Sequence, residues 1–139
     1  MNILFICVAN SARSQIAEGL ANTILGDLAE IKSAGSQPAT AIHSQATTVM
    51  AEIGIDISGQ SPKSISQLPP EFLSRLDIVI ALCSEEQCPF IPGKHRFESW
   101  ALPDPANPAL SEIERLELFR KTREQIKLKI ERLKELVKT

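Results

Sequence analysis

The sequence predicts an α/β fold, in which a four-stranded, doubly wound parallel sheet is flanked by helices. Short apolar runs without alternation occur at residues 3–8 and 78–82, and this pattern is typical of strands that are buried on both faces. Amphipathic helical segments alternate with the strand segments, which favours a parallel sheet with right-handed crossovers. No repeat or low-complexity segment divides the 139 residues, so we expect a single domain over residues 1–139.

Each element follows from the local pattern, in chain order. The apolar run 3–8 is followed at once by a polar turn over residues 9–12. From Arg13, apolar residues recur at every fourth position until Gly26, which predicts the first helix. The other predicted elements are a short strand over 29–33, a helix over 41–53, a short helix that begins within 68–73, the strand 78–82, a short strand within 95–100 and a long amphipathic helix over 111–139. The long helix carries many charged residues, which we expect to form a face exposed to solvent.

The composition is that of a globular protein and excludes several classes of function. Hydrophobic residues make up 43% of the chain and charged residues 23%, with a formal net charge of −2. This charge gives no general attraction to nucleic acid or to anionic membrane surfaces. The run 3–8 is too short for a signal peptide, and no apolar stretch approaches the ~20 residues of a membrane helix, so we expect a cytoplasmic protein. His43 and His95 have no metal-ligand spacing to the cysteines, so neither a metal nor a cofactor is expected.

The chain has three cysteines, Cys7, Cys83 and Cys88, of which the first two lie at strand ends. Their odd number argues against a framework of structural disulfides, and buried reduced thiols are the simplest alternative. Cys7 lies at the end of the first strand, however, and Cys83 directly follows the strand 78–82. Because the carboxyl ends of parallel strands lie along one edge of a sheet, we expect Cys7 and Cys83 to face the same crevice.

The segment from Cys7 to Ser14 contains the pattern C-x5-R and predicts an oxyanion-binding loop. Cys7 ends a strand and Arg13 opens a helix, so backbone N–H groups and the helix dipole create a site for a tetrahedral anion. Arg13 offers a planar fork of donors to that anion, Ser14 can donate to the sulfur, and the positive field favours the thiolate. The residues expected to hold the anion are Val8, Ala9, Asn10, Ser11, Ala12, Arg13 and Ser14. In the alternative interpretation, Cys7 is a buried cysteine beside a surface arginine.

Further motifs follow this loop in order along nearly the whole chain. They are residues 14–19 (SQIAEG), 33–35 (SAG) and 50–58 (MAEIGIDIS), then Cys83, Cys88-Pro89, Trp100 and residues 104–106 (DPA). Together with the C-x5-R loop, they resemble the low-molecular-weight protein tyrosine phosphatase superfamily, and within it the thioredoxin-coupled arsenate reductases. The resemblance implies a phosphatase-like fold and leaves two activities open. One is the reduction of arsenate to arsenite in arsenic detoxification, with thioredoxin or a glutaredoxin-type reductant as partner. The other is the hydrolysis of phosphate monoesters through a cysteinyl-phosphate intermediate.

The resemblance also implies roles for individual side chains. In both activities Cys7 is the nucleophile, Arg13 holds the transition state and Asp104 is the general acid. Arsenate reduction further implies that Cys83 attacks the Cys7 sulfur and releases arsenite. Cys88 then attacks Cys83 and leaves a disulfide for the external reductant.

Two absences favour reduction over hydrolysis. The chain has no tyrosine, whereas the phosphatases of this superfamily usually carry aromatic residues after the acid loop, and Ala12 stands where they tend to have a second loop cysteine. Only four residues separate Cys83 from Cys88, a shorter spacing than is usual in the thioredoxin-coupled group, so another reductant or an idle Cys88 are alternatives. Lys63 stands where some relatives have an acidic residue near a bound monovalent cation, so the resemblance does not extend that cation site to this chain.

Overall fold

A computed structural model of the chain describes residues 1–84 and 89–138. In these residues four strands form one sheet in the order β2-β1-β3-β4, and every neighbouring pair is parallel. The strands are β1 (Asn2–Cys7), β2 (Glu30–Gly35), β3 (Leu76–Cys83) and β4 (Arg96–Leu102). The predicted four-stranded parallel sheet is therefore confirmed.

Both faces of the sheet are covered, which explains why β1 and β3 are apolar without alternation. Successive side chains of a strand point to opposite faces, so Ile3 and Phe5 enter one apolar cluster while Leu4 and Ile6 enter the other. All four of these side chains are fully buried. The two clusters together form the core that fixes the register of the central strands.

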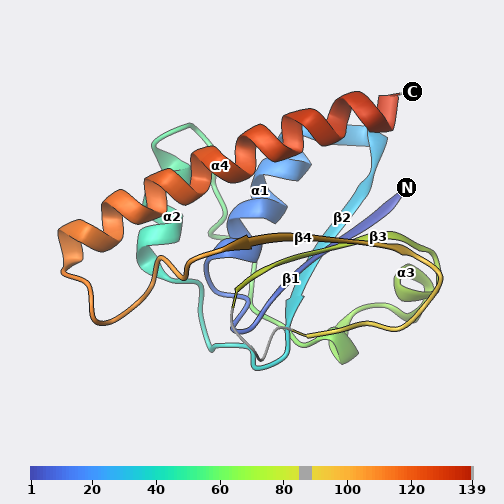
Figure 1. Cartoon of the computed structure of the whole chain (residues 1–139), viewed down its shortest axis with the longest axis horizontal. Coiled ribbons are helices and arrows are strands. Elements are labelled where there is room, and N and C mark those ends of the chain that lie inside the picture. Colours follow the sequence, from blue (N-terminus) through green and yellow to red (C-terminus); the bar gives the residue numbers. More distant parts are fainter. Residues whose placement is uncertain (85–88, 139) are drawn as a thin grey trace.

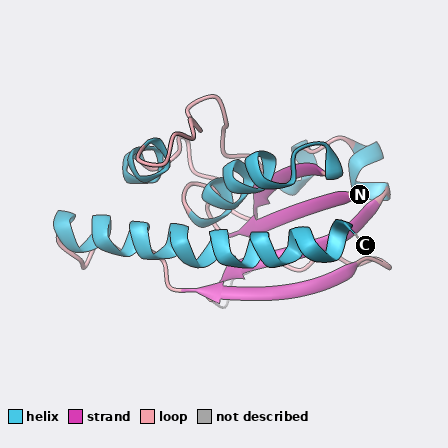
Figure 2. Cartoon of the chain, turned by 90° about the horizontal axis from the view of Figure 1, so that it is seen from above, coloured by secondary structure: helices cyan, strands magenta, loops and turns pink. Residues whose placement is uncertain are grey.

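In the described part of the chain, three α-helices cover one face and a short helix covers the other (Figure 1). The first group is α1 (Arg13–Leu25), α2 (Ser44–Ala51) and α4 (Glu112–Lys138), and the fourth helix is α3 (Pro70–Ser74). Figure 2 shows α4 running roughly along the strand direction. Its buried stripe consists of Phe119, Thr122, Ile126, Ile130 and Leu133. None of the helices in the described ranges combines the length and the apolar character that a membrane span requires.

Some element bounds differ from the predicted ones, and strand pairing is the main reason. β2 extends past residue 33 to Gly35, because Gly35 still pairs with Cys7 of β1. β4 likewise continues past residue 100, and its last residue, Leu102, pairs with Cys83. Helix α2 is shorter than the predicted 41–53, since His43 caps its first turn through a hydrogen bond from the Gln45 backbone N–H.

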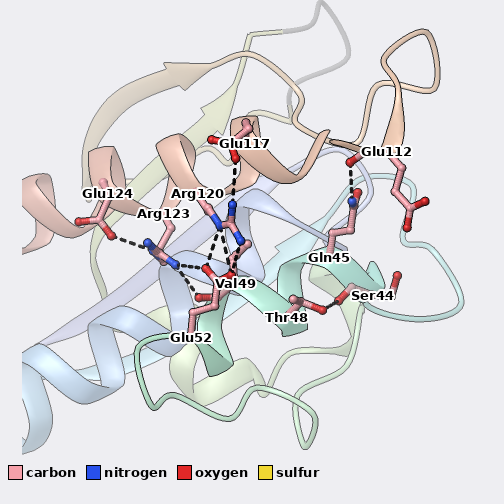
Figure 3. A network of polar contacts seen from close by, with 10 residues as sticks. All are labelled: Ser44, Gln45, Thr48, Val49, Glu52, Glu112, Glu117, Arg120, Arg123 and Glu124. Carbon is pink, nitrogen blue, oxygen red and sulfur yellow. Dashed lines mark hydrogen bonds and ion pairs between the residues drawn. The ribbon is translucent and has the colours of Figure 1, made fainter. Parts of the chain in front are cut away.

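A network of ion pairs joins α4 to the end of α2 (Figure 3). Glu52 accepts hydrogen bonds from Arg120 Nη2 at 2.7 Å and from Arg123 Nη1 at 2.8 Å, and Arg123 Nη1 also donates to the Val49 carbonyl at 2.8 Å. The hydrogen bonds from Arg120 are the main cause that lowers the pKa of Glu52 below its ordinary value. Arg120 and Arg123 of the charged face therefore also connect two helices, which helical periodicity alone did not predict.

Candidate active site

The candidate site lies where the strand order changes direction. From β1 the chain proceeds to β2 on one side, whereas β3 pairs with β1 on the other side. In an open parallel sheet, the crevice at the carboxyl ends of two such strands is where ligands bind. Cys7 ends β1 and Cys83 ends β3, and neighbouring strands lie about 4.8 Å apart. The fold thus brings these two strand ends to the same edge of the sheet, and both cysteines are buried, with exposed fractions of 2% and 4%.

Hydrogen bonds donated to its carbonyl groups hold the loop after Cys7 from outside. Three backbone hydrogen bonds of 2.9 Å each come from residues 37–43: Gln37 donates to Val8, Ala39 donates to Ala9 and His43 donates to Ser11. In a trans peptide the N–H points away from the C=O. Tying these carbonyls outward therefore turns the N–H groups of Ala9, Asn10 and Ala12 toward the inner side of the loop, where they suit an anion.

Asn10 holds the loop in shape from the inside. It is fully buried and has φ of 50°, a left-handed conformation that asparagine tolerates better than most residues. Its Nδ2 donates to Ser14 Oγ at 2.7 Å and to Ser33 Oγ at 3.0 Å, while its Oδ1 accepts from the Lys63 backbone N–H at 3.0 Å. Both hydrogens and the oxygen of this amide are used, so its orientation is fixed by its partners.

Ser14 links this amide to the sulfur of Cys7. Ser14 Oγ lies 2.9 Å from Cys7 Sγ and at the same time accepts the hydrogen bond from Asn10. Since the hydroxyl accepts from Asn10, its own hydrogen is available for the sulfur. A hydrogen bond donated to sulfur stabilises the thiolate more than the thiol. Cys7 is a free thiol in this arrangement.

Arg13 and Asp104 complete the wall of a small cavity. Arg13 opens α1, is 4% exposed, and donates from Nη1 to the Leu102 carbonyl at 2.8 Å. Asp104 lies in the loop after β4, where its Oδ1 accepts from the Ala106 backbone N–H at 2.9 Å. The cavity has a volume of about 140 Å³ and is lined by Cys7, Val8, Ala9, Ser11, Ala12, Arg13, Asp104 and Ala106.

The residues that line the cavity determine what it can bind. Among the described residues that line it, no side chain is aromatic, and most are small. It combines a guanidinium, inward amides, a nucleophilic sulfur and one carboxyl group that can carry a proton. This combination suits a small tetrahedral oxyanion rather than a ring-bearing ester.

The structure brings together most of the residues predicted for the site. Cys7, Asp104 and the loop residues 8, 9 and 11–13 line the cavity. Ser14 and Asn10 connect to Cys7 through hydrogen bonds, and Cys83 ends the neighbouring strand. Cys88 lies outside the described residues. From the sequence, Ser33 of β2 was named only as part of the 33–35 motif and had no predicted role in the site, because a serine inside a strand has no local signal for accepting from Asn10.

His43 also contributes more than the sequence suggested. It lies at the start of α2, in the helix-end position that was predicted. Its backbone N–H donates to the Ser11 carbonyl of the loop, and its ring packs on Phe119 with a centroid distance of 5.0 Å. Burial lowers the pKa of His43 below its ordinary value; Arg115 acts in the same direction and Asp104 opposes it. A neutral imidazole is thereby favoured, which leaves Nδ1 free to accept from the Gln45 backbone N–H.

The family model for low molecular weight phosphotyrosine protein phosphatases matches residues 2–139. The chain belongs to this family. Among curated relatives of this phosphatase-family chain, an arsenate reductase of Bacillus subtilis is 37% identical over 139 residues, which cover 99% of this chain and 95% of the relative. Arsenate reductase 2 of Staphylococcus epidermidis is 39% identical over 134 residues, covering 95% of both chains.

Solved structures give the same result for the fold of this phosphatase-family chain. An arsenate reductase in the phosphate binding state superimposes with a TM-score of 0.81 and 34% identity, covering 99% of both chains. A thioredoxin-dependent arsenate reductase of Corynebacterium glutamicum has a TM-score of 0.73 and 32% identity, with 98% of this chain and 61% of that one covered. An arginine phosphatase, YwlE, with a TM-score of 0.71 and 19% identity, shares the fold.

Replacing Gly35 with alanine is expected to disturb the loop. A Cβ at Gly35 would collide with the Val8 carbonyl oxygen and lie 3.0 Å from Asn10 N, and backbone atoms yield less easily than a side chain. We expect Gly35→Ala to lower the free energy of unfolding by about 1–3 kcal/mol. We expect its affinity for inorganic phosphate to fall by about tenfold, since the amides lose their alignment. Urea unfolding and calorimetric titration measure the two effects.

Gly59→Ala is the matched control for this experiment. A Cβ at Gly59 would meet no atom within 4 Å, so both quantities should stay close to those of the unmodified protein. Phosphate affinity that is unchanged in Gly35→Ala would contradict the close approach of Gly35 to the loop.

Proposed function

We propose that this protein is a cytoplasmic arsenate reductase that converts arsenate to arsenite through a relay of three cysteines. The proposal is carried by one observation: Cys83 ends the strand next to the one that Cys7 ends, at the edge of the sheet where the oxyanion loop begins. A hydrolytic enzyme needs one nucleophilic cysteine, whereas a reductase needs a second thiol to accept the oxidation. Relatives at 37–39% identity that are named arsenate reductases support the same activity.

The first step is nucleophilic attack by the Cys7 thiolate on arsenic. The inward amides and Arg13 hold the three oxygens that stay on arsenic and stabilise the charge that develops there. Asp104, at the cavity wall, gives a proton to the departing oxygen, which leaves as water. The product is a covalent adduct with a Cys7 sulfur–arsenic(V) bond.

The second step moves two electrons to arsenic. Cys83 attacks Cys7 Sγ as a thiolate, a sulfur–sulfur bond forms, and the sulfur–arsenic bond breaks with its electron pair on arsenic. Arsenic is reduced from the pentavalent to the trivalent state and leaves as arsenite, while the two thiols are oxidised to a disulfide. Cys88 then attacks Cys83 Sγ, which frees the Cys7 thiolate and forms the Cys83–Cys88 disulfide. A dithiol protein of the thioredoxin or glutaredoxin type reduces this disulfide and completes the cycle.

Hydrolysis of phosphate monoesters is the alternative activity, and it is favoured by the family to which the chain belongs. One experiment decides between the two: arsenite formation from arsenate is measured with thioredoxin, thioredoxin reductase and NADPH, beside hydrolysis of p-nitrophenyl phosphate by the same protein. We expect NADPH consumption that requires arsenate, and only slow hydrolysis. Efficient hydrolysis without arsenate-dependent NADPH consumption, in the presence of either thioredoxin or glutaredoxin, would assign the protein to the phosphatases.

Replacing Asp104 with asparagine is expected to slow the chemical step. Asparagine keeps the acceptor that receives the Ala106 N–H, so the loop retains its turn, but it has no proton to give. We expect kcat for arsenate to fall by about 10²-fold, with KM changed less than about threefold. Steady-state kinetics measure both constants, and Asp27→Asn, on an exposed turn, is the control. An unchanged kcat would exclude Asp104 as the acid.

A further inference from the structure

A continuous chain of polar contacts connects Cys7 to a surface ion pair. From the sulfur it passes through Ser14 to Asn10, whose second Nδ2 hydrogen goes to Ser33. Ser33 Oγ in turn donates to Glu18 Oε1 at 2.5 Å. The direction of this last bond is fixed, because Ser33 Oγ accepts from the Asn10 amide and its hydrogen is left for the carboxylate.

Lys63 contacts this series of hydrogen-bonded residues at two places. Its backbone N–H donates to Asn10 Oδ1 at 3.0 Å, and its Nζ lies 3.9 Å from Glu18 Oε1. The Nζ group also donates to the Ser61 carbonyl at 3.0 Å, which helps to hold the ammonium in place. The Glu18 side chain is only 13% exposed and that of Lys63 24% exposed, so this ion pair is less screened by water than an ordinary surface pair.

We propose that Lys63 is a positioning residue for the nucleophile: its ammonium offsets the Glu18 charge that orients Ser33 and Asn10, and so keeps the Cys7 thiolate favourable. The proposal rests on the nucleophilic role of Cys7 in the proposed function. Lys63 is not among the described residues that line the substrate cavity, so it acts on the nucleophile from outside the cavity.

The physical reason is the sign of the charges. Two negative groups, the Glu18 carboxylate and the Cys7 thiolate, lie at the two ends of one hydrogen-bonded chain. Each makes the other harder to form, and the chain passes through fully buried Ser33 and Asn10, where screening is weak. The Lys63 ammonium, 3.9 Å from Glu18 Oε1, opposes the field of the carboxylate. Without it, the partly buried Glu18 carboxylate acts on the thiolate without compensation.

The test measures the ionisation of Cys7 and does not depend on arsenate turnover. Reduced protein is alkylated with iodoacetamide across a range of pH, and the rate at Cys7 is followed by mass spectrometry of the peptide that contains it. The variants are Lys63→Met, Lys63→Arg, Glu18→Gln and the double variant Lys63→Met/Glu18→Gln. Lys121→Met, on the exposed surface of α4, is the control for loss of a lysine charge.

The expected pattern has opposite signs in the two single variants. Lys63→Met should raise the pH midpoint of Cys7 alkylation by about 0.5–1 pH unit, and Lys63→Arg should restore it. Glu18→Gln should lower the midpoint, since the lysine charge is then unopposed, while glutamine still accepts from Ser33. The double variant should return close to the original midpoint.

Two results would overturn the proposal. One is a midpoint for Lys63→Met that matches Lys121→Met. The other is a shift in the same direction for Lys63→Met and Glu18→Gln, which would indicate a general loosening of the loop. Circular dichroism and thermal unfolding of each variant establish that it is folded when alkylated. If the midpoints follow the expected pattern but no arsenate is reduced, the proposed function fails while the role of Lys63 stands.

Discussion

Cys7→Ser is expected to lose at least about 10⁴-fold in arsenate reduction and in hydrolysis of p-nitrophenyl phosphate alike. A serine hydroxyl at this position is not ionised by the surrounding amides to the degree that a thiol is, and oxygen cannot form the disulfide that the relay requires. The substitution changes one atom at a buried strand end. The fold and the cavity should therefore persist.

The measurement pairs both activity assays with calorimetric titration of inorganic phosphate. Phosphate binding by Cys7→Ser should stay within about an order of magnitude of the original affinity, because amides and Arg13 do the binding. Activity above about 1% with folded protein would mean that another group attacks the substrate. Such a result would contradict both enzymatic interpretations.

Cys83→Ser is expected to reduce arsenate turnover by at least about 10³-fold and to leave hydrolysis of p-nitrophenyl phosphate nearly unchanged. The adduct on Cys7 then forms but lacks the Cys83 thiol that breaks the sulfur–arsenic bond. Hydrolysis needs only water at this stage, so it serves as an internal control in the same protein. Equal loss of both activities would indicate damage to the loop and would contradict a role of Cys83 in the relay.

Cys88→Ser separates the two later thiols. It should release about one arsenite per protein molecule and then stop, because Cys7 and Cys83 remain joined in a disulfide. Quenched single-turnover experiments with mass spectrometry of the cross-linked peptides detect this species. Continued turnover of Cys88→Ser with thioredoxin would show that the external reductant attacks the first disulfide directly, and that Cys88 is idle.

The fold was predictable because its signals are local. The segments that form β1 and β3 are apolar at successive positions, which is typical of a strand covered on both faces of the sheet. Their last residues are Cys7 and Cys83. The arginine that opens α1 is likewise visible from the C-x5-R spacing and the helical period that follows. From these positions the crevice follows by the geometry of parallel sheets.

The parts that sequence reasoning missed depend on contacts between distant residues. Ser33 is 23 residues from Asn10, and the Lys63 backbone N–H that binds Asn10 is 53 residues away. The backbone donors of residues 37–43 carry no side-chain signature at all. The pairing of Arg120 with Glu52, 68 residues apart, is equally invisible in helical periodicity, which shows only that both are polar.

The outward-tied carbonyls of the loop have a further consequence for selectivity. Because residues 37–43 already hold Val8, Ala9 and Ser11, little chain entropy is lost when an anion enters, and the cradle responds only to shape and charge. Phosphate and arsenate are alike in both respects, so phosphate competes with arsenate for the same binding site. Discrimination between them then comes after binding, because attack of Cys83 on the Cys7 sulfur reduces pentavalent arsenic and releases it as arsenite, whereas phosphorus is not reduced in this way.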